Sequence, residues 1–199
     1  MPNVTHPPNI LVLAGSARLD SVNRKLARQT VDALRAAGVE ATLADLRDFP
    51  MPMYDGDLEA GEGIPPAAKA LKELARQHDG FAIASPEYNG SFPALLKNAL
   101  DWISRPEPGE RPLEVFRGKV AAILSASPGP GGGTRGLHHL RELLEMMSVK
   151  VIPRELAIAR SGGAFDDAGQ LIRAEDITGL QELAVGLAHA AVSQREAAV

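Results

Sequence analysis

The chain has 199 residues, contains no cysteine and carries a formal net charge of −4, with its charged residues interspersed. The length fits one α/β domain, the lack of cysteine excludes disulfides and thiolate chemistry, and the mild acidity argues against a broad nucleic-acid-binding surface. No apolar run approaches the roughly 18 residues that span a bilayer, so we expect neither a nucleic-acid nor a membrane partner.

The N-terminal residues 1–9 are rich in proline and lack the apolar core of a signal peptide. The sequence therefore predicts a flexible tail over 1–9, a single domain over 10–199 and a cytoplasmic location.

The first predicted unit is a buried strand over residues 10–14, a polar turn and a helix that runs to Gly38. The turn supplies hydroxyl, amide and guanidinium donors beside the helix N-terminus, from Ser16, Arg18, Ser21 and Asn23. Such donors suit a phosphate monoester dianion. The alternative is that Ser21 or Asn23 simply caps a surface helix. No P-loop motif is present.

The rest of the chain alternates predicted strands with predicted helices. We expect further strands over residues 39–45, 81–85, 119–126 and 149–153, and further helices over 65–77, 94–103, 137–147 and 176–195. The stretches 46–63 and 104–118 look too irregular for an element. This alternation predicts a parallel sheet that is covered by helices on both faces.

Polar or glycine-rich clusters follow the first, third and fourth strands, so they should meet at the carboxyl edge of the sheet, where α/β proteins bind ligands. In 86–93, peptide groups and Tyr88 suit a planar heterocycle, although Asn89-Gly90 alone is also typical of a simple turn. The loop 127–136 lets a flat ligand approach the backbone. It contains a GxGxxG match, which we discount because it follows the fourth strand.

No residue pattern points to acid–base, nucleophilic or metal chemistry. The histidines look like surface or packing positions, Ser16 has no evident base, and neither HExxH nor GxSxG occurs. The sequence therefore predicts no catalytic side chain and no metal site.

Three stretches together resemble the signatures of the NADPH-dependent FMN reductase family, namely GSARLDSVN (15–23), PEYNGS (86–91) and SASPGPGGG (125–133). The similarity spans roughly residues 10–190. It implies a flavodoxin-like three-layer α/β sandwich, with a five-stranded parallel sheet of order 2-1-3-4-5. It also implies bound FMN, NADPH or NADH as co-substrate, and a homodimer or homotetramer.

The resemblance assigns the FMN phosphate to the first stretch and the flavin ring to the other two. The cofactor-binding residues that it implies are Gly15, Ser16, Arg18, Ser21, Asn23, Pro86, Glu87, Tyr88, Asn89, Gly90, Ser125, Ser127, Gly129 and Gly132. The implied reaction is a ping-pong transfer of hydride from NAD(P)H through FMN to quinones or similar acceptors, such as chromate, azo compounds or free flavin. The alternatives are a flavodoxin-type electron carrier and a sensory domain that has lost its flavin.

Overall fold

Three continuous apolar runs form the centre of a parallel sheet in the computed structural model, which describes residues 6–197. These runs are almost completely buried, as expected of parallel strands covered on both faces, and they form β1 (Asn9–Ala14), β3 (Gly80–Ala84) and β4 (Val120–Ala126). Strand β2 (Glu40–Asp45) lies at one edge beside β1, and its side chains are only partly buried.

The sheet has the order β2-β1-β3-β4-β5, and the pairings between these strands are parallel. The predicted order and the flavodoxin-like α/β class are therefore confirmed. The strand predicted over 149–153 is wrong in extent. Only β5 (Lys150–Val151) pairs there, and the chain returns to β4 as a sixth strand, β6 (Leu156–Ile158). Pro153 lies between the two pieces and has no N–H for a ladder hydrogen bond.

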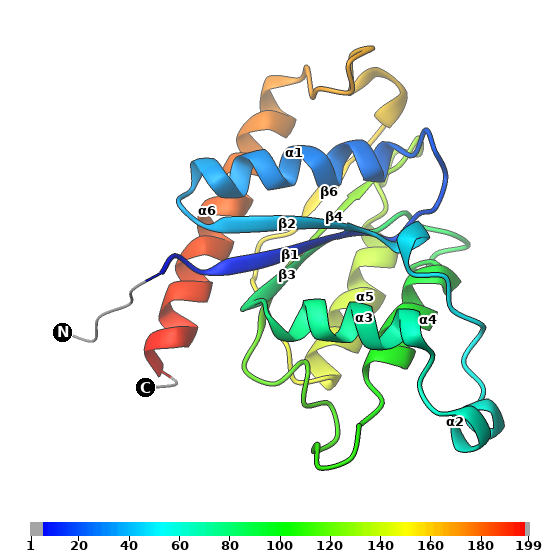
Figure 1. Cartoon of the computed structure of the whole chain (residues 1–199). Coiled ribbons are helices and arrows are strands. Elements are labelled where there is room, and N and C mark those ends of the chain that lie inside the picture. The colour runs from blue at the N-terminus through cyan, green and yellow to red at the C-terminus, as the bar shows by residue number, and fades with distance from the viewer. Residues whose placement is uncertain (1–5, 198–199) are drawn as a thin grey trace.

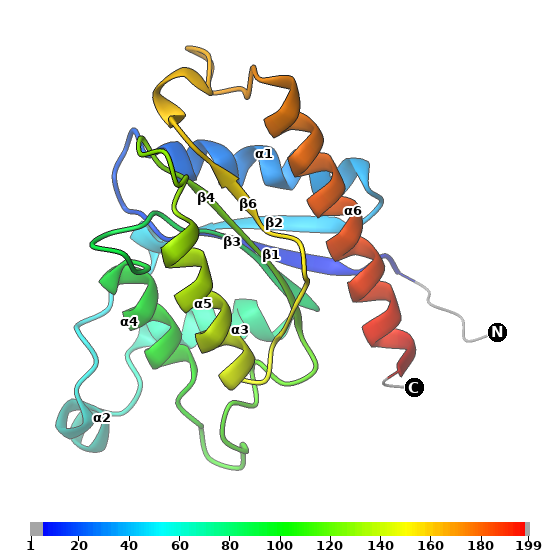
Figure 2. The same cartoon turned by 180° about the vertical axis from the view of Figure 1, so that it is seen from behind.

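Helices cover both faces of the sheet, which gives the predicted three layers (Figures 1 and 2). One face packs against α1 (Val22–Ala36) and α6 (Ala174–Ala197). The other face packs against α3 (Pro66–Arg76), α4 (Ala94–Ile103) and α5 (Thr134–Met146). Successive side chains of β1 show the alternation, since Ile10 and Val12 join the first core and Leu11 and Leu13 join the second.

The stretch 46–63 contains more structure than its composition predicts. A short 3-10 helix, η1 (Leu46–Asp48), follows β2, and α2 (Gly56–Glu62) projects away from the sheet (Figure 1). Asp55 caps α2 by accepting a 2.8 Å hydrogen bond from the N–H of Asp57. Because α2 buries none of its residues, it has no apolar face that a sequence pattern could reveal.

Part of the predicted tail is fastened to the domain. Asn9 is the first residue of β1, the N–H of Glu40 donates to the carbonyl of Pro8 at 2.8 Å, and Arg195 donates to the carbonyl of His6 at 2.9 Å. Residues 1–5 of that prediction lie outside the described residues. A further 3-10 helix, η2 (Ser161–Gly163), precedes α6. Within residues 6–197, no helix is both long enough and apolar enough to cross a bilayer.

Lys119 is a buried cation at the amino edge of the sheet, where its ammonium group donates to the carbonyl of His78. Burial lowers the pKa of Lys119 from 10.5 to about 8, against the attraction of Asp79. The folded protein therefore releases this proton at a lower pH than the unfolded chain does. Because of this difference, the free energy of unfolding should rise by up to about 3 kcal/mol between pH 8 and pH 10.5.

Urea unfolding of the wild type and of Lys119→Met at the two pH values tests this expectation. The substitution removes the titrating group, and the other lysines and the tyrosines contribute equally to both proteins. The wild type should gain more stability than the variant as the pH rises. An equal gain in both proteins would show that Lys119 keeps an ordinary pKa.

Candidate functional site

Three loops meet at the carboxyl edge of the sheet. The first loop (residues 15–21) follows β1, the second loop (residues 85–93) follows β3, and the third loop (residues 127–133) follows β4. They enclose a crevice of about 300 Å³, lined by Ser16, Arg18, Ser21, Val22, Asn23, Pro86, Glu87, Tyr88, Ala126, Ser127 and Pro128. Eight of these residues are predicted site residues. Val22, Ala126 and Pro128 were not predicted.

The first loop presents its polar groups to this crevice. Ser21 occupies the N-cap position of α1 with an extended backbone, but its side chain makes no capping hydrogen bond. Ser16 and Ser21 are largely buried residues, and they lie beside the start of a helix whose first N–H groups have no partner within the helix. Arg18 is exposed at the rim. This group of donors matches a dianion better than it matches a simple helix cap.

The second loop folds back as a miniature hairpin. Tyr88 and Ser91 exchange two backbone hydrogen bonds, of 2.8 and 3.1 Å, and the φ values of Asn89 and Gly90 are +53° and +80°. Positive φ at both central residues defines a type I′ turn, which explains the Asn-Gly pair. Asn89 and Gly90 therefore shape the loop and do not line the crevice, while Tyr88 stands at its edge with its side chain half-exposed.

The carboxylate of Glu87 fastens the second loop to α5. Its Oε2 accepts a hydrogen bond of 3.2 Å from the N–H of Gly136, in the first turn of that helix. His139 Nδ1 lies 3.2 Å from Ser91 Oγ and adds a second link. Gly136 permits this close approach, since a Cβ there would lie 3.3 Å from Glu87 Cβ. The side chain of Glu87 is thus already engaged by α5.

The third loop depends on two glycines in the left-handed region, Gly132 with φ of +62° and Gly133 with φ of +96°. A Cβ on Gly132 would lie 2.8 Å from the backbone of Ala157, and one on Gly133 would lie 2.0 Å from Ser125 Oγ. Ser125 is completely buried and its hydroxyl has no hydrogen-bond partner. Ser125 therefore lies beneath the loop and Gly132 packs against the backbone of β6, whereas Ser127 faces the crevice.

The two remaining predicted site residues also lie outside the lining. A Cβ placed on Gly15 would lie 3.4 Å from side-chain atoms of Leu96, Pro86 and Ser85. The N–H of Gly15 donates to the carbonyl of Ala84 at 2.9 Å. Gly129 stands beside Ser127, and its N–H lies 3.4 Å from Ser127 Oγ. Both glycines shape the backbone of their loops.

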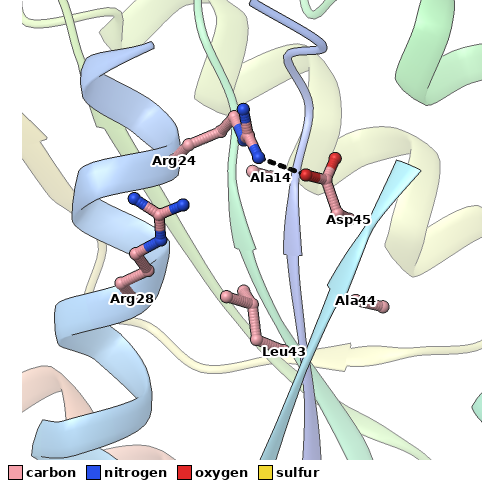
Figure 3. Close-up of a pocket in the computed structure, with 6 residues that line it drawn as sticks. All are labelled: Ala14, Arg24, Arg28, Leu43, Ala44 and Asp45. Atoms are coloured by element: carbon pink, nitrogen blue, oxygen red, sulfur yellow. Dashed lines mark hydrogen bonds and ion pairs between the residues drawn. The ribbon is translucent and has the colours of Figure 1, made fainter. Parts of the chain in front are cut away.

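Arg24 supports the first loop from behind, and the sequence patterns did not reveal it. Its Nη1 donates to the carbonyls of Arg18 and Leu19, both at 3.3 Å, and its Nη2 pairs with Asp45 at the end of β2. Figure 3 shows Arg24 of α1 reaching Asp45 at the end of β2, and Arg28 one turn further along α1; both line a small pocket together with Leu43. The one available signal was a basic residue in the first turn of a helix, where a cation opposes the helix dipole.

The residues that line the crevice are suited to binding a ligand and not to transferring protons. Its lining has no histidine, and its single carboxylate, Glu87, is held by α5. Across the described residues, no group of three or more histidines and carboxylates is arranged to hold a metal ion. The lining instead offers hydrogen-bond donors that suit a phosphate at one end, and flat walls of proline, alanine and tyrosine at the other. This donor set fits a phosphorylated planar heterocycle such as FMN.

Comparison with known proteins agrees with this geometry. The family model described as NADPH-dependent FMN reductase matches residues 8–163. An NAD(P)H-dependent FMN reductase of Pseudomonas aeruginosa is 38% identical over 82% of this chain and 84% of its own. A quinone reductase of Escherichia coli is 39% identical over 72% of each chain. The flavoenzyme NAD(P)H:(acceptor) oxidoreductase of Paracoccus denitrificans superposes with a TM-score of 0.80 at 26% identity, over 94% of this chain and 98% of its own.

Proposed function

The chain belongs to the NADPH-dependent FMN reductase family, and from this premise we propose that its crevice binds FMN and passes hydride from NAD(P)H to a quinone. One observation carries the proposal. Phosphate-type donors and a flat apolar wall share a single crevice of about 300 Å³ at the carboxyl edge of the sheet. In the strand order 2-1-3-4-5, the gap between β1 and β3 is where the direction of chain progression reverses, and ligands bind there.

In this proposal the first loop holds the phosphate of FMN. The hydroxyls of Ser16 and Ser21, the guanidinium of Arg18 and the first N–H groups of α1 are the donors. The second and third loops border the ring, with Pro86, Tyr88 and Ser127 on the lining. When bound, FMN supplies the chemistry of accepting and donating hydride. The chain orients the ring, excludes water and contributes peptide dipoles.

We further propose a ping-pong order, in which the nicotinamide leaves before the acceptor enters. The single crevice supports this order, because its open side beside half-exposed Tyr88 would serve both partners in turn. The Escherichia coli relative is named for quinone reduction, so a quinone is the preferred acceptor. Chromate, azo compounds and free flavin are further acceptors to test.

The proposal also includes a homodimer or homotetramer in the cytoplasm. Support for oligomerisation comes from exposed apolar side chains, among them Met53, Leu95 and Tyr88, of which Tyr88 stands at the edge of the crevice. Sedimentation at several protein concentrations measures the assembly directly.

The visible absorption spectrum of the purified protein, recorded without oxygen, tests the function. We expect a flavin spectrum that bleaches when NADPH is added and returns when a quinone follows. A flavin spectrum that NADPH does not change would point to an electron carrier. A colourless protein that takes up no added FMN would contradict the proposal as a whole.

A further inference from the structure

Asn23 is the most deeply buried polar residue of the crevice lining, with 1% of its surface exposed. Its side-chain amide pairs with the backbone of Ala126 in both directions. Nδ2 donates to the carbonyl of Ala126 at 2.9 Å, and Oδ1 accepts from the N–H of Ala126 at 2.9 Å. The pair joins the first turn of α1 to the last residue of β4, across 103 positions of sequence.

The pairing of β4 explains why Ala126 needs this partner. In a parallel sheet, the N–H and C=O groups of alternate residues face opposite neighbours. Leu124 accepts from Ser85, where the chain leaves β3, while Ser127 donates to Ile158 of β6 on the other side. The N–H and C=O groups of Ala126 point toward the β3 side of the strand, as those of Leu124 do, but β3 has already ended at Ala84. The amide of Asn23 thus takes the place of the next residue of β3.

Asn23 also occupies a particular position in the crevice. It follows Ser21 and Val22, which line the proposed phosphate end, and its partner Ala126 precedes Ser127 on the third loop. Without the amide of Asn23, both backbone groups of a buried residue would lose their partner, and the third loop would lose its fixed starting point. One amide bridge therefore sets the distance between two walls of the crevice.

From these contacts we infer that Asn23 is a positioning residue that fastens the start of α1, where the first loop ends, to the end of β4, where the third loop begins. The inference rests on the proposed function, because it assigns the two loops to the two ends of one FMN molecule. It differs from the role that the resemblance implies, in which Asn23 holds the phosphate. A phosphate ligand would matter for FMN but not for riboflavin, which lacks the phosphate. A positioning residue matters equally for both flavins.

The first test uses Asn23→Ala without flavin and follows backbone amide hydrogen exchange by NMR. The exchange of the Ala126 amide should speed up on the order of tenfold or more, since its only partner is lost. Thr30→Val is the matched control, because Thr30 is also buried on α1 but its hydroxyl donates within the helix, to Leu26. Unchanged exchange at Ala126 in Asn23→Ala would overturn the inference, whether or not the protein binds flavin.

The second test compares the affinities for FMN and riboflavin, measured by quenching of flavin fluorescence. Asn23→Ala should weaken both by the same factor, on the order of tenfold. Loss of FMN affinity with riboflavin affinity unchanged would make Asn23 a phosphate ligand and overturn the positioning role. If Asn23→Ala does not fold, Asn23→Ser replaces it, because the shorter neutral side chain cannot bridge both backbone groups of Ala126 and adds no charge near the phosphate. A wild type that binds neither flavin would refute the proposed function, while the exchange experiment still decides the role of Asn23.

Discussion

Replacing Gly133 with alanine is expected to remove flavin binding and to lower the free energy of unfolding by about 3 kcal/mol. The new Cβ would lie 2.0 Å from Ser125 Oγ and 2.8 Å from Ser125 Cβ, and the residue would have to keep a φ of +96°. Ser125 is completely buried on a central strand, and its Cβ cannot move away unless the backbone of that strand moves. The third loop would therefore be displaced from the crevice.

Gly131→Ala is the matched control for this substitution. It adds the same methyl group two residues earlier in the same loop, where no atom lies within 4 Å and φ is not positive. Its effect on unfolding should stay within about 0.5 kcal/mol. Thermal and urea unfolding of the flavin-free proteins measures both. Equal stability of the two variants would mean that the third loop does not pack against Ser125.

Replacing Arg18 with alanine should weaken FMN binding about tenfold or more, because a charge-assisted hydrogen bond contributes about 1.5–3 kcal/mol. Riboflavin affinity should not change, since Arg18 lies at the phosphate end of the crevice. The two affinities are measured by fluorescence quenching. An equal loss of affinity for both flavins would show that Arg18 does not contact the phosphate.

Arg28→Ala provides the control for loss of positive charge. Arg28 also lies near the N-terminal half of α1, but it faces the small pocket beside β2 and not the crevice (Figure 3). A distant surface charge contributes little, so FMN affinity should stay within about twofold. A loss like that of Arg18→Ala would indicate a general electrostatic effect.

The features that sequence predicted well are those that depend on burial. The apolar runs of β1, β3 and β4 are short and bounded by turn residues, which favours buried strands, and the alternation with amphipathic helices then favours a parallel three-layer fold. The convergence of the three loops follows from that topology and needs no coordinates. Helix α2 escaped prediction because none of its residues is fully buried. The chain between β5 and β6 contains Pro153, which has no N–H for a ladder hydrogen bond.

The roles of single residues were harder to predict, because they depend on contacts between distant parts of the chain. Asn23 looks like one more donor in the first loop, and only its 2.9 Å contacts with Ala126 reveal another use. Glu87 similarly looks like a group that faces the ligand, whereas α5 holds its carboxylate. The need for Gly133 comes from Ser125, eight positions earlier, which lies beneath it. A linear pattern carries no signal for such pairs.

The most direct test of the phosphate site is the ³¹P NMR spectrum of the protein with one equivalent of FMN. If the first loop holds the phosphate as a dianion, its bound resonance should stay at one chemical shift from roughly pH 5.5 to pH 8, although a free phosphate monoester titrates near pH 6. A resonance that titrates like free FMN would show that Ser16, Arg18 and Ser21 do not hold the phosphate. That result would contradict the assignment of the crevice to FMN.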